Sequence, residues 1–471
     1  MVFSSLTFLL YFLPIVLILY FVRRDIRWRN GVLLVASLFF YAWGEPIWIV
    51  AMVASTAVNY YCARRMVRVK GKRARRKWMI LGVGVSGILL FIFKYASFVI
   101  NSVLGIVSPS LKVPVLELPI GISFYTFQVI TYTVDVYRRK ERPQKYFTRL
   151  LLYVSCFPQL IAGPIVQYGD IAGQIGQRQS TPEGFSSGMQ RFVIGLGKKV
   201  VFANICGSAL SSMPLAGGGA QLSVLGAWYA AFLYTLQIYF DFSGYSDMAI
   251  GLGRILGFTY KENFNYPYAS TSVREFWRRW HISLGSFFRD YVYIPLGGNR
   301  RGLKRTVFNT LVVWTLTGFW HGANWTFLLW GFYYGALLTI DLLGGKRVIA
   351  ALPKAVNWIL TMVLVIVSWV IFYYGSLSQA FEHIGAMFGV GSCGLMDAAS
   401  LTVIKTYSIF PLIAFIASLP VAKWVQGAMQ RFGLRERGME RARVAWLSVC
   451  LVLSVLFLVG QTYNPFIYFQ F

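Results

Sequence analysis

The sequence predicts an all-α, polytopic integral membrane protein, and three observations support this fold class. Hydrophobic residues make up 57% of the 471 residues, charged residues only 13%, and the mean hydropathy is +0.58. This composition leaves too little polar surface to coat a water-soluble globule of that length. The other two observations are apolar runs of near-spanning length and basic blocks between them.

Five apolar runs contain no acidic or basic residue, and each suits a helix that crosses a hydrocarbon core about 30 Å thick. These runs are Leu6–Val22, Trp78–Phe93, Leu222–Phe240, Val356–Tyr374 and Val444–Gly460. When shorter and interrupted segments are included, the sequence predicts roughly nine to twelve spans. Because no linker or repeat divides the chain, we expect a single membrane domain over residues 1–471.

The net charge of +28 comes from basic residues in short blocks between the apolar segments. Such blocks are typical of cytoplasmic loops, so we expect these loops inside, the N-terminus outside and no nucleic-acid partner. Setting topology and binding membrane lipids are the favoured roles of the blocks, and an anionic cytosolic substrate is the alternative. The blocks are Arg23–Arg29, Arg64–Lys77, Arg138–Arg149, Asn299–Arg305 and Arg431–Arg443.

Helix breakers and polar groups interrupt the hydropathy in two regions. In the first region, Pro and Gly break Pro119–Gln128 and Phe157–Ile165, which predicts a kink, a re-entrant hairpin or a cavity wall. The second region opens with Asp241 and Asp247 at the end of an apolar span. Intramembrane carboxylates favour a functional role, with helix capping or pairing to arginine as the alternative. Ser272–Leu296 then has the pattern of one amphipathic, interfacial helix.

The three histidines have different surroundings. His383 lies in a loop-like stretch, which predicts a structural or solvated residue. His281 falls on the aromatic face of the amphipathic segment, where packing is the plainer interpretation. His321 has Gly318 and Gly322 beside it, and such small neighbours let a substrate approach the ring. Burial favours the neutral imidazole, which can accept a proton, so His321 is a candidate general base, with an interhelical hydrogen bond as the alternative.

Other catalytic chemistries lack their motifs in this sequence. It contains no glycine-rich phosphate loop, no paired-histidine zinc motif and no nucleophile elbow. The five cysteines are scattered and indicate neither a disulfide framework nor a thiolate metal site. We therefore expect no metal site, no resident cofactor, and no nucleotide hydrolysis, metalloproteolysis or serine-triad catalysis.

Five blocks in order resemble the membrane-bound O-acyltransferase family, most closely its bacterial polysaccharide branch. The blocks are Pro119–Phe124, Tyr239–Met248, Glu275–Leu284, Tyr293–Asn299 and Phe319–Trp325. This branch includes membrane proteins of alginate, peptidoglycan and cellulose O-acetylation and, more distantly, of teichoic acid D-alanylation. The resemblance implies a ring of tilted helices around a thin-floored funnel. It also implies that His321 is catalytic near the constriction, and that His281 is a positioning or substrate-contact group on the cytoplasmic side.

The resemblance further implies the substrates, partners and location. Acetyl-CoA or another cytosolic acyl thioester would be the donor, and alginate or a similar exported polysaccharide the acceptor. A periplasmic acetyltransferase or acyl-acceptor protein would be the partner, and the bacterial inner membrane the location.

The C-terminal stretch Asn464–Phe471 resembles a short motif of bacterial acyl-transfer systems in which a tyrosine carries the acyl group. The tyrosine here would be Tyr468, whose phenol, of pKa about 10, needs a base such as His321 to attack a thioester. An interfacial aromatic anchor is an equally good interpretation of this ending. Two other classes of function stay open: a transporter or flippase without acyl transfer, and a scaffold that docks a soluble transferase.

Overall fold

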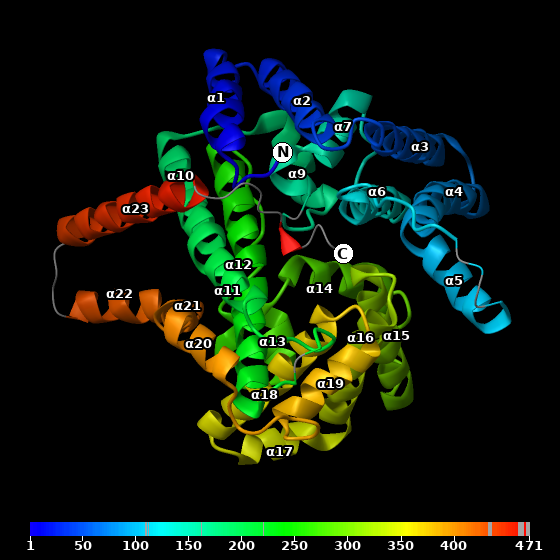
Figure 1. Cartoon of the computed structure of the whole chain (residues 1–471). Coiled ribbons are helices and arrows are strands. Elements are labelled where there is room, and N and C mark those ends of the chain that lie inside the picture. Colours follow the sequence, from blue (N-terminus) through cyan, green and yellow to red (C-terminus); the bar gives the residue numbers. More distant parts are fainter. Residues whose placement is uncertain are drawn as a thin grey trace. The chain divides into compact units, whose positions relative to one another are not determined.

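The computed structural model describes residues 1–108, 111, 113–161, 163–219, 221–431, 436–459 and 466–467. All regular elements in this part of the chain are helices, which confirms the all-α prediction (Figure 1). The chain forms two compact units, residues 1–192 with 245–261 and residues 193–244 with 262–471. Helices α10 (Pro182–Gly197) and α12 (Val224–Ile255) each run from one unit into the other. That the chain is functionally one domain stays a prediction.

Polar side chains hold the helices of the first unit together. Asn59 of α3 (Ile49–Arg68) donates to Ser86 Oγ of α4 (Lys72–Leu90) over 2.7 Å. It accepts from Thr133 Oγ1 of α6 (Ile122–Tyr137) over 2.6 Å. Such interhelical hydrogen bonds stabilise apolar helices that have no hydrophobic reason to associate in lipid. Besides its part of α10 and α12, the unit contains η1 (Phe8–Phe12), α1 (Leu13–Val22), α2 (Ile26–Ala42), α3 (Ile49–Arg68), α4 (Lys72–Leu90), η2 (Phe91–Tyr95), α5 (Ala96–Val107), α6 (Ile122–Tyr137), α7 (Phe147–Ser155), α8 (Phe157–Leu160) and α9 (Tyr168–Gln177).

The predicted interruptions in the first unit are confirmed. Helix α6 starts directly after Gly121, whose φ of +76° favours glycine. Helix α8 has only four residues, and the N–H of Phe157 at its start donates to Ser37 Oγ over 3.1 Å. Gln159 in this helix is buried and donates to the carbonyl of Tyr153 over 2.6 Å. The broken backbone is thus enclosed in protein, as it must be at membrane depth.

In the second unit, helices α15 (Leu303–His321) and α16 (Trp325–Ile340) pack closely against each other and lie side by side in Figure 1. Besides its part of α10 and α12, the unit contains η3 (Lys198–Ala203), α11 (Asn204–Ser211), η4 (Pro267–Ala269), α13 (Val273–Arg279), α14 (Ile282–Phe288), η5 (Arg289–Tyr293), α15 (Leu303–His321), α16 (Trp325–Ile340), η6 (Asp341–Gly345), α17 (Lys346–Ala351), α18 (Lys354–Tyr373), α19 (Leu377–Met387), α20 (Ala398–Tyr407), α21 (Ile409–Ser418), α22 (Val421–Arg431) and α23 (Glu436–Val459).

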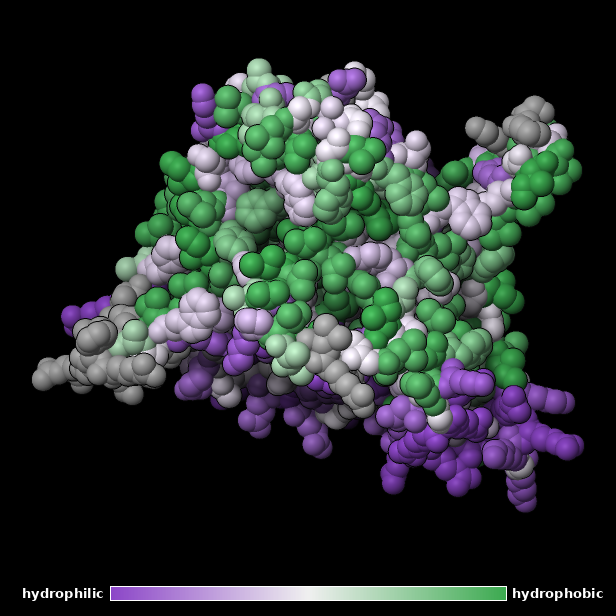
Figure 2. All heavy atoms as spheres, turned by 90° about the horizontal axis from the view of Figure 1, so that it is seen from below, coloured by the Kyte–Doolittle hydropathy of each residue, from purple (hydrophilic) through white to green (hydrophobic). Residues whose placement is uncertain are grey.

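The surface of both units suits a lipid environment. Large apolar side chains are exposed on α1, α18 and α23, among them Ile18, Ile359 and Leu456. Figure 2 shows apolar residues over much of one face, with hydrophilic residues gathered along its edge. A water-soluble monomer rarely exposes apolar patches of this extent, so the chain is a membrane protein.

Four helical segments of the described chain are long and apolar enough to cross a membrane, and five are if one bent pair counts as a span. They are Lys72–Val107, Pro182–Ser211, Trp325–Gly345 and Lys354–Tyr373, with the pair Ala398–Tyr407 and Ile409–Ser418. Phe8–Val22 and Arg443–Val459 are shorter apolar helices. The expected nine to twelve spans stay a prediction.

The prediction of a single amphipathic helix over Ser272–Leu296 is wrong. The chain forms α13 and α14 with a break between them at His281, whose φ is +45°. A neighbouring segment competes for the backbone there: the N–H of Ile282 donates to the carbonyl of Asn263 over 3.0 Å, and the N–H of Asn265 donates to the carbonyl of Arg279 over 2.9 Å. These bonds replace the helical ones and stop the first helix.

Two further expectations need correction. Asp241 and Asp247 do not lie at the end of a span, because α12 continues through both and ends only at Ile255. His383 does not lie in a loop but inside α19, where it is buried. In both cases a helix continues through polar residues at which low hydropathy had predicted its end, because packing against other helices stabilises it.

Candidate active site

The second unit brings both His321 and His281 close to one tryptophan, Trp320. His321 is the last residue of α15 and His281 sits at the α13–α14 break, and both are buried. The Trp320 ring centroid lies 4.9 Å from that of His321 and 6.0 Å from that of His281. The two histidines singled out from the sequence therefore share one aromatic environment, although they are forty residues apart.

Aromatic rings surround the imidazole of His321. Its centroid lies 5.1 Å from those of Trp330 on α16 and Phe372 on α18, with interplanar angles of 83° and 80°. These edge-to-face contacts fix the plane of the ring and exclude bulk water.

Two glycines allow α15 and α16 to approach closely enough to form this site. A Cβ atom on Gly318 would lie 2.2 Å from the carbonyl oxygen of Phe327, and one on Gly331 would lie 2.4 Å from that of Trp314. Close approach through small residues is the usual way in which membrane helices pack. Since Gly331 directly follows Trp330, this contact also sets the distance between Trp330 and His321.

The turn after His321 is fixed by Asn324. Its side chain caps α16 by accepting from the N–H of Thr326 over 3.2 Å, and it donates to the carbonyl of Gly375 over 2.7 Å. The first bond satisfies a helix N-terminus, and the second ties the turn to the end of α18. Asn324 therefore has a structural role within the Phe319–Trp325 block.

Hydrogen bonds determine the tautomer of His281. Asn263 Oδ1 accepts from the backbone N–H of Ser283 over 3.2 Å and from its hydroxyl over 2.9 Å, so this atom is an oxygen acceptor. His281 Nδ1 lies 3.2 Å from the same oxygen and must donate to it, which leaves the lone pair on Nε2. Burial lowers the pKa of His281 to about 3, so this residue stays neutral at physiological pH.

The two carboxylates of α12 are paired with cations. Asp247, in the first unit, forms an ion pair with Arg191 over 2.6 Å, as the arginine-pairing alternative predicted. Asp241, in the second unit, pairs with Lys199 of η3 instead of an arginine, and both side chains are buried. Gly244 permits this pairing, because a Cβ there would lie 2.8 Å from the carbonyl oxygen of Gly195.

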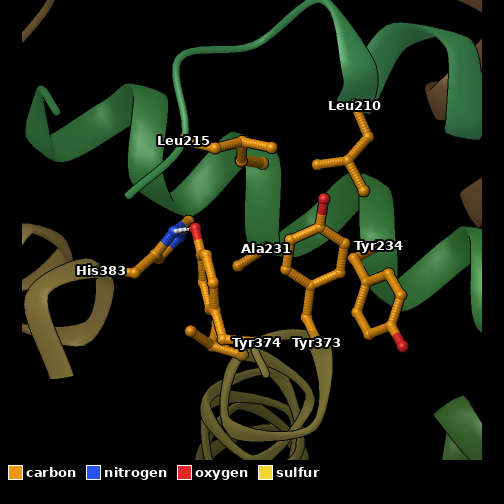
Figure 3. Close-up of a pocket in the computed structure, with 9 residues that line it drawn as sticks. Leu210, Leu215, Ala231, Tyr234, Tyr373, Tyr374 and His383 are labelled. Carbon is orange, nitrogen blue, oxygen red and sulfur yellow. Dashed lines mark hydrogen bonds between the residues drawn. The ribbon is translucent and has the colours of Figure 1, made fainter. Parts of the chain in front are cut away.

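His383 belongs to a separate polar cluster. Its Nε2 donates to the carbonyl of Ala227 over 3.0 Å, so its Nδ1 accepts from the hydroxyl of Tyr374 over 2.8 Å (Figure 3). The same hydroxyl accepts from the N–H of Ala216 over 3.1 Å. Burial lowers the pKa of His383. The cavity beside this cluster, about 210 Å³ with its open mouth, does not have His281 or His321 in its lining. His383 is therefore structural, as expected.

Other site predictions fare differently. Tyr468 lies outside the described residues, but the two residues before it, Phe466 and Ile467, are described. Among the described residues, no group of three or more His, Cys, Asp or Glu side chains could hold a metal ion. Lys199 was not predicted as a site residue, although two lysines within an apolar stretch are a usable signal. Asn263 was not predicted either, because nothing in the local sequence distinguishes it.

Comparisons with known proteins identify the family of the chain. A profile of the membrane-bound O-acyltransferase family matches residues 140–379, which include four of the five sequence blocks. The chain is 41% identical to "Probable alginate O-acetylase AlgI" of Pseudomonas putida, and all of both chains is covered.

More distant relatives extend the comparison. The chain is 32% identical to "Peptidoglycan O-acetyltransferase" of Helicobacter pylori, with 100% of this chain and 98% of that one covered. It is 28% identical to "Teichoic acid D-alanyltransferase" of Bacillus subtilis over 47% of this chain and 58% of that one. The chain belongs to the membrane-bound O-acyltransferase family, in its bacterial polysaccharide O-acetylation branch.

Proposed function

We propose that this protein moves an acetyl group from a cytosolic thioester such as acetyl-CoA across the bacterial inner membrane for O-acetylation of an exported polysaccharide. The observation that carries the proposal is the buried pair of His321 and His281 around Trp320 in a chain of this family. His321 acts as the general base and His281 as a neutral positioning or substrate-contact group. No resident cofactor is needed, because the thioester is a substrate.

The chemistry is an acyl exchange from sulfur to oxygen. A hydroxyl oxygen attacks the thioester carbonyl carbon while His321 takes the hydroxyl proton. The carbon–sulfur bond then breaks, and the leaving thiolate takes that proton from the imidazolium. One acyl–oxygen bond has formed, one acyl–sulfur bond has broken, and His321 is neutral again. The surrounding rings of Trp330 and Phe372 hold the imidazole in place and keep water from competing as the nucleophile.

The attacking hydroxyl is that of Tyr468 in our proposal. An acyl-tyrosine formed from the cytosolic thioester would then be attacked by a hydroxyl of the acceptor, with His321 again removing the proton and the tyrosine oxygen regaining it. Splitting one transfer into two lets the donor and the acceptor stay on opposite sides of the membrane. The acceptor is a periplasmic acetyltransferase or acyl-acceptor protein, or the polysaccharide itself.

The relatives support the class of acceptor. Their names include alginate O-acetylase and peptidoglycan O-acetyltransferase, so alginate or a similar polysaccharide is the proposed final acceptor. We further propose that roughly nine to twelve tilted spans surround a funnel leading to His321, with the basic loops on the cytosolic side near the anionic donor.

The test uses purified protein, acetyl-CoA labelled in the acetyl group, and a soluble acceptor. The wild type is expected to release free CoA thiol and to transfer label, whereas His321→Ala loses at least about 10²-fold in rate, the usual range for a general base. His383→Ala is the matched control, because it removes a buried histidine outside the site. Wild-type transfer by His321→Ala would overturn the proposal.

The same assay separates the other classes of function. A transporter or flippase would move an intact substrate, leave the thioester uncleaved and carry no label on the protein. A scaffold would tolerate substitutions of His321 and Tyr468 and would instead lose activity when its partner-binding loops are changed.

A further inference from the structure

The buried ion pair of Asp241 and Lys199 has a third member, which is the C-terminal segment of the chain. One carboxylate oxygen of Asp241 accepts from Lys199, and the other accepts from the backbone N–H of Ile467 over 2.9 Å. The ammonium of Lys199 also lies 4.8 Å from the ring centroid of Phe466, a cation–π contact. Phe466 is only 1% exposed. The charge pair therefore contacts the segment through its backbone and its side chain.

Both charges are expensive to bury, which argues for a specific use. Asp241 lies inside the long helix α12, and Lys199 lies in η3, a π-helical turn that interrupts the helix after α10. A π-helical turn of this kind often marks a functional site. Burying an ion pair contributes little net stability compared with apolar residues of the same size, but each charge specifies a partner of defined geometry. Here the defined geometry includes Ile467.

We propose that Asp241 and Lys199 are positioning residues that dock the C-terminal segment at Phe466 and Ile467, and that acyl transfer by the adjoining Tyr468 depends on this docking. The docking stands on the contacts of Phe466 and Ile467 alone, and its catalytic meaning rests on the proposed function. Asp241 binds the backbone of Ile467, and Tyr468 is the next residue in the sequence. Loss of this hydrogen bond is therefore expected to affect the residue that carries the proposed nucleophile.

The next residue of α12 links this docking point to the histidine pair. Phe242 follows Asp241 and packs edge-on against His281, with ring centroids 4.6 Å apart and an interplanar angle of 88°. His281 in turn lies 6.0 Å from Trp320, the neighbour of His321. Two successive residues of α12 therefore have different partners: Asp241 binds the C-terminal segment at Ile467, and Phe242 contacts His281.

Two pairs of variants test the docking. Ile467→Pro removes the N–H that Asp241 binds, and Ile467→Ala keeps it. The double variant Asp241→Leu with Lys199→Met removes both charges and every acceptor, whereas Asp241→Asn with Lys199→Gln keeps an amide oxygen for the N–H of Ile467. Neither double variant leaves an unpaired buried charge, so each is expected to fold. The midpoint of thermal unfolding in detergent verifies this.

The first readout is hydrogen exchange at the amide of Ile467, measured by mass spectrometry of the C-terminal peptide of the intact protein. The wild type and the Asn/Gln variant are expected to exchange slowly, and the Leu/Met variant at least about ten-fold faster. The second readout is acetyl transfer. We expect a loss of about 10- to 100-fold for the Pro and Leu/Met variants, because a misplaced nucleophile costs rate, and near wild-type rates for their controls.

The outcomes separate this inference from the proposed function. Equal exchange at Ile467 in the wild type and a folded Leu/Met variant overturns the docking, even if Tyr468 carries acetyl. A protected Ile467 amide in a protein whose Tyr468→Phe variant transfers acetyl normally upholds the docking and overturns the relay.

Discussion

Substituting Gly331 by alanine tests whether the close approach of α15 and α16 builds the site. The new Cβ would lie 2.4 Å from the carbonyl oxygen of Trp314 and 3.0 Å from backbone atoms of Gly318. These neighbours are backbone, so the two helices must separate. Overpacking of this kind costs about 1–3 kcal/mol, and the better helix propensity of alanine returns at most about 1 kcal/mol. We expect a net loss of about 1–2 kcal/mol in unfolding free energy.

Activity should fall more than stability does. Trp330 precedes the substituted residue and contacts the ring of His321 over 5.1 Å, so helix separation shifts the base from its position. We expect at least about a ten-fold loss of acetyl transfer per folded molecule. Gly335→Ala is the matched control one turn further along α16, since its Cβ would first meet the flexible end of Leu311 at 3.2 Å. The assays are denaturant unfolding in detergent and transfer from labelled acetyl-CoA. A Gly331→Ala protein as stable and active as Gly335→Ala would show that the close approach of α15 and α16 at Gly331 does not build the site.

Three further predictions concern single side chains. His383→Phe removes the acceptor of the Tyr374 hydroxyl and should cost about 1–3 kcal/mol of stability without changing the specific activity of the folded fraction. Asn324→Ala removes a helix cap and the bond to Gly375, so its unfolding free energy should fall by about 1–2 kcal/mol, and by less in Asn324→Asp, which keeps the cap. Burial lowers the pKa of His281 to about 3, whereas an unfolded histidine titrates near 6.5. Below about pH 6.5 the unfolded chain therefore binds a proton that the folded protein does not, and the free energy of unfolding falls by up to about 1.4 kcal/mol per pH unit. Thermal unfolding between pH 7 and 4 should therefore show a shallower pH dependence in His281→Gln than in the wild type.

Hydropathy sufficed for the fold class, because an apolar run of spanning length satisfies its own backbone hydrogen bonds in lipid by forming a helix. Periodicity failed at Ser272–Leu296. The pattern there is amphipathic throughout. However, Asn263 and Asn265, which lie earlier in the sequence, form backbone hydrogen bonds with the residues on either side of the break at His281. Such competition depends on tertiary contacts that no local pattern encodes.

The candidate site was predictable to a similar degree. His321 could be chosen from its small neighbours, but the expected reason was wrong. The space beside Gly318 is filled by Gly331 and that beside Gly322 by the ring of Phe327, so these glycines serve close packing and not the approach of a substrate. The partner of Asp241 could not be predicted, because Lys199 and Ile467 meet it only through folding. The wrong assignment of His383 to a loop had the same cause, since α19 is stabilised by burial against other helices of its unit.

In the proposed mechanism, His321 activates a hydroxyl of this chain to take the acyl group from a thioester. Mass spectrometry of the C-terminal peptide tests this step, after the purified protein is incubated with labelled acetyl-CoA and no acceptor. We expect one added acetyl group on Tyr468 in the wild type, its removal when acceptor is supplied, and its absence in His321→Ala. An unmodified Tyr468 in a wild-type protein that turns over acceptor, or an acetylated Tyr468 formed at the wild-type rate in His321→Ala, would contradict it.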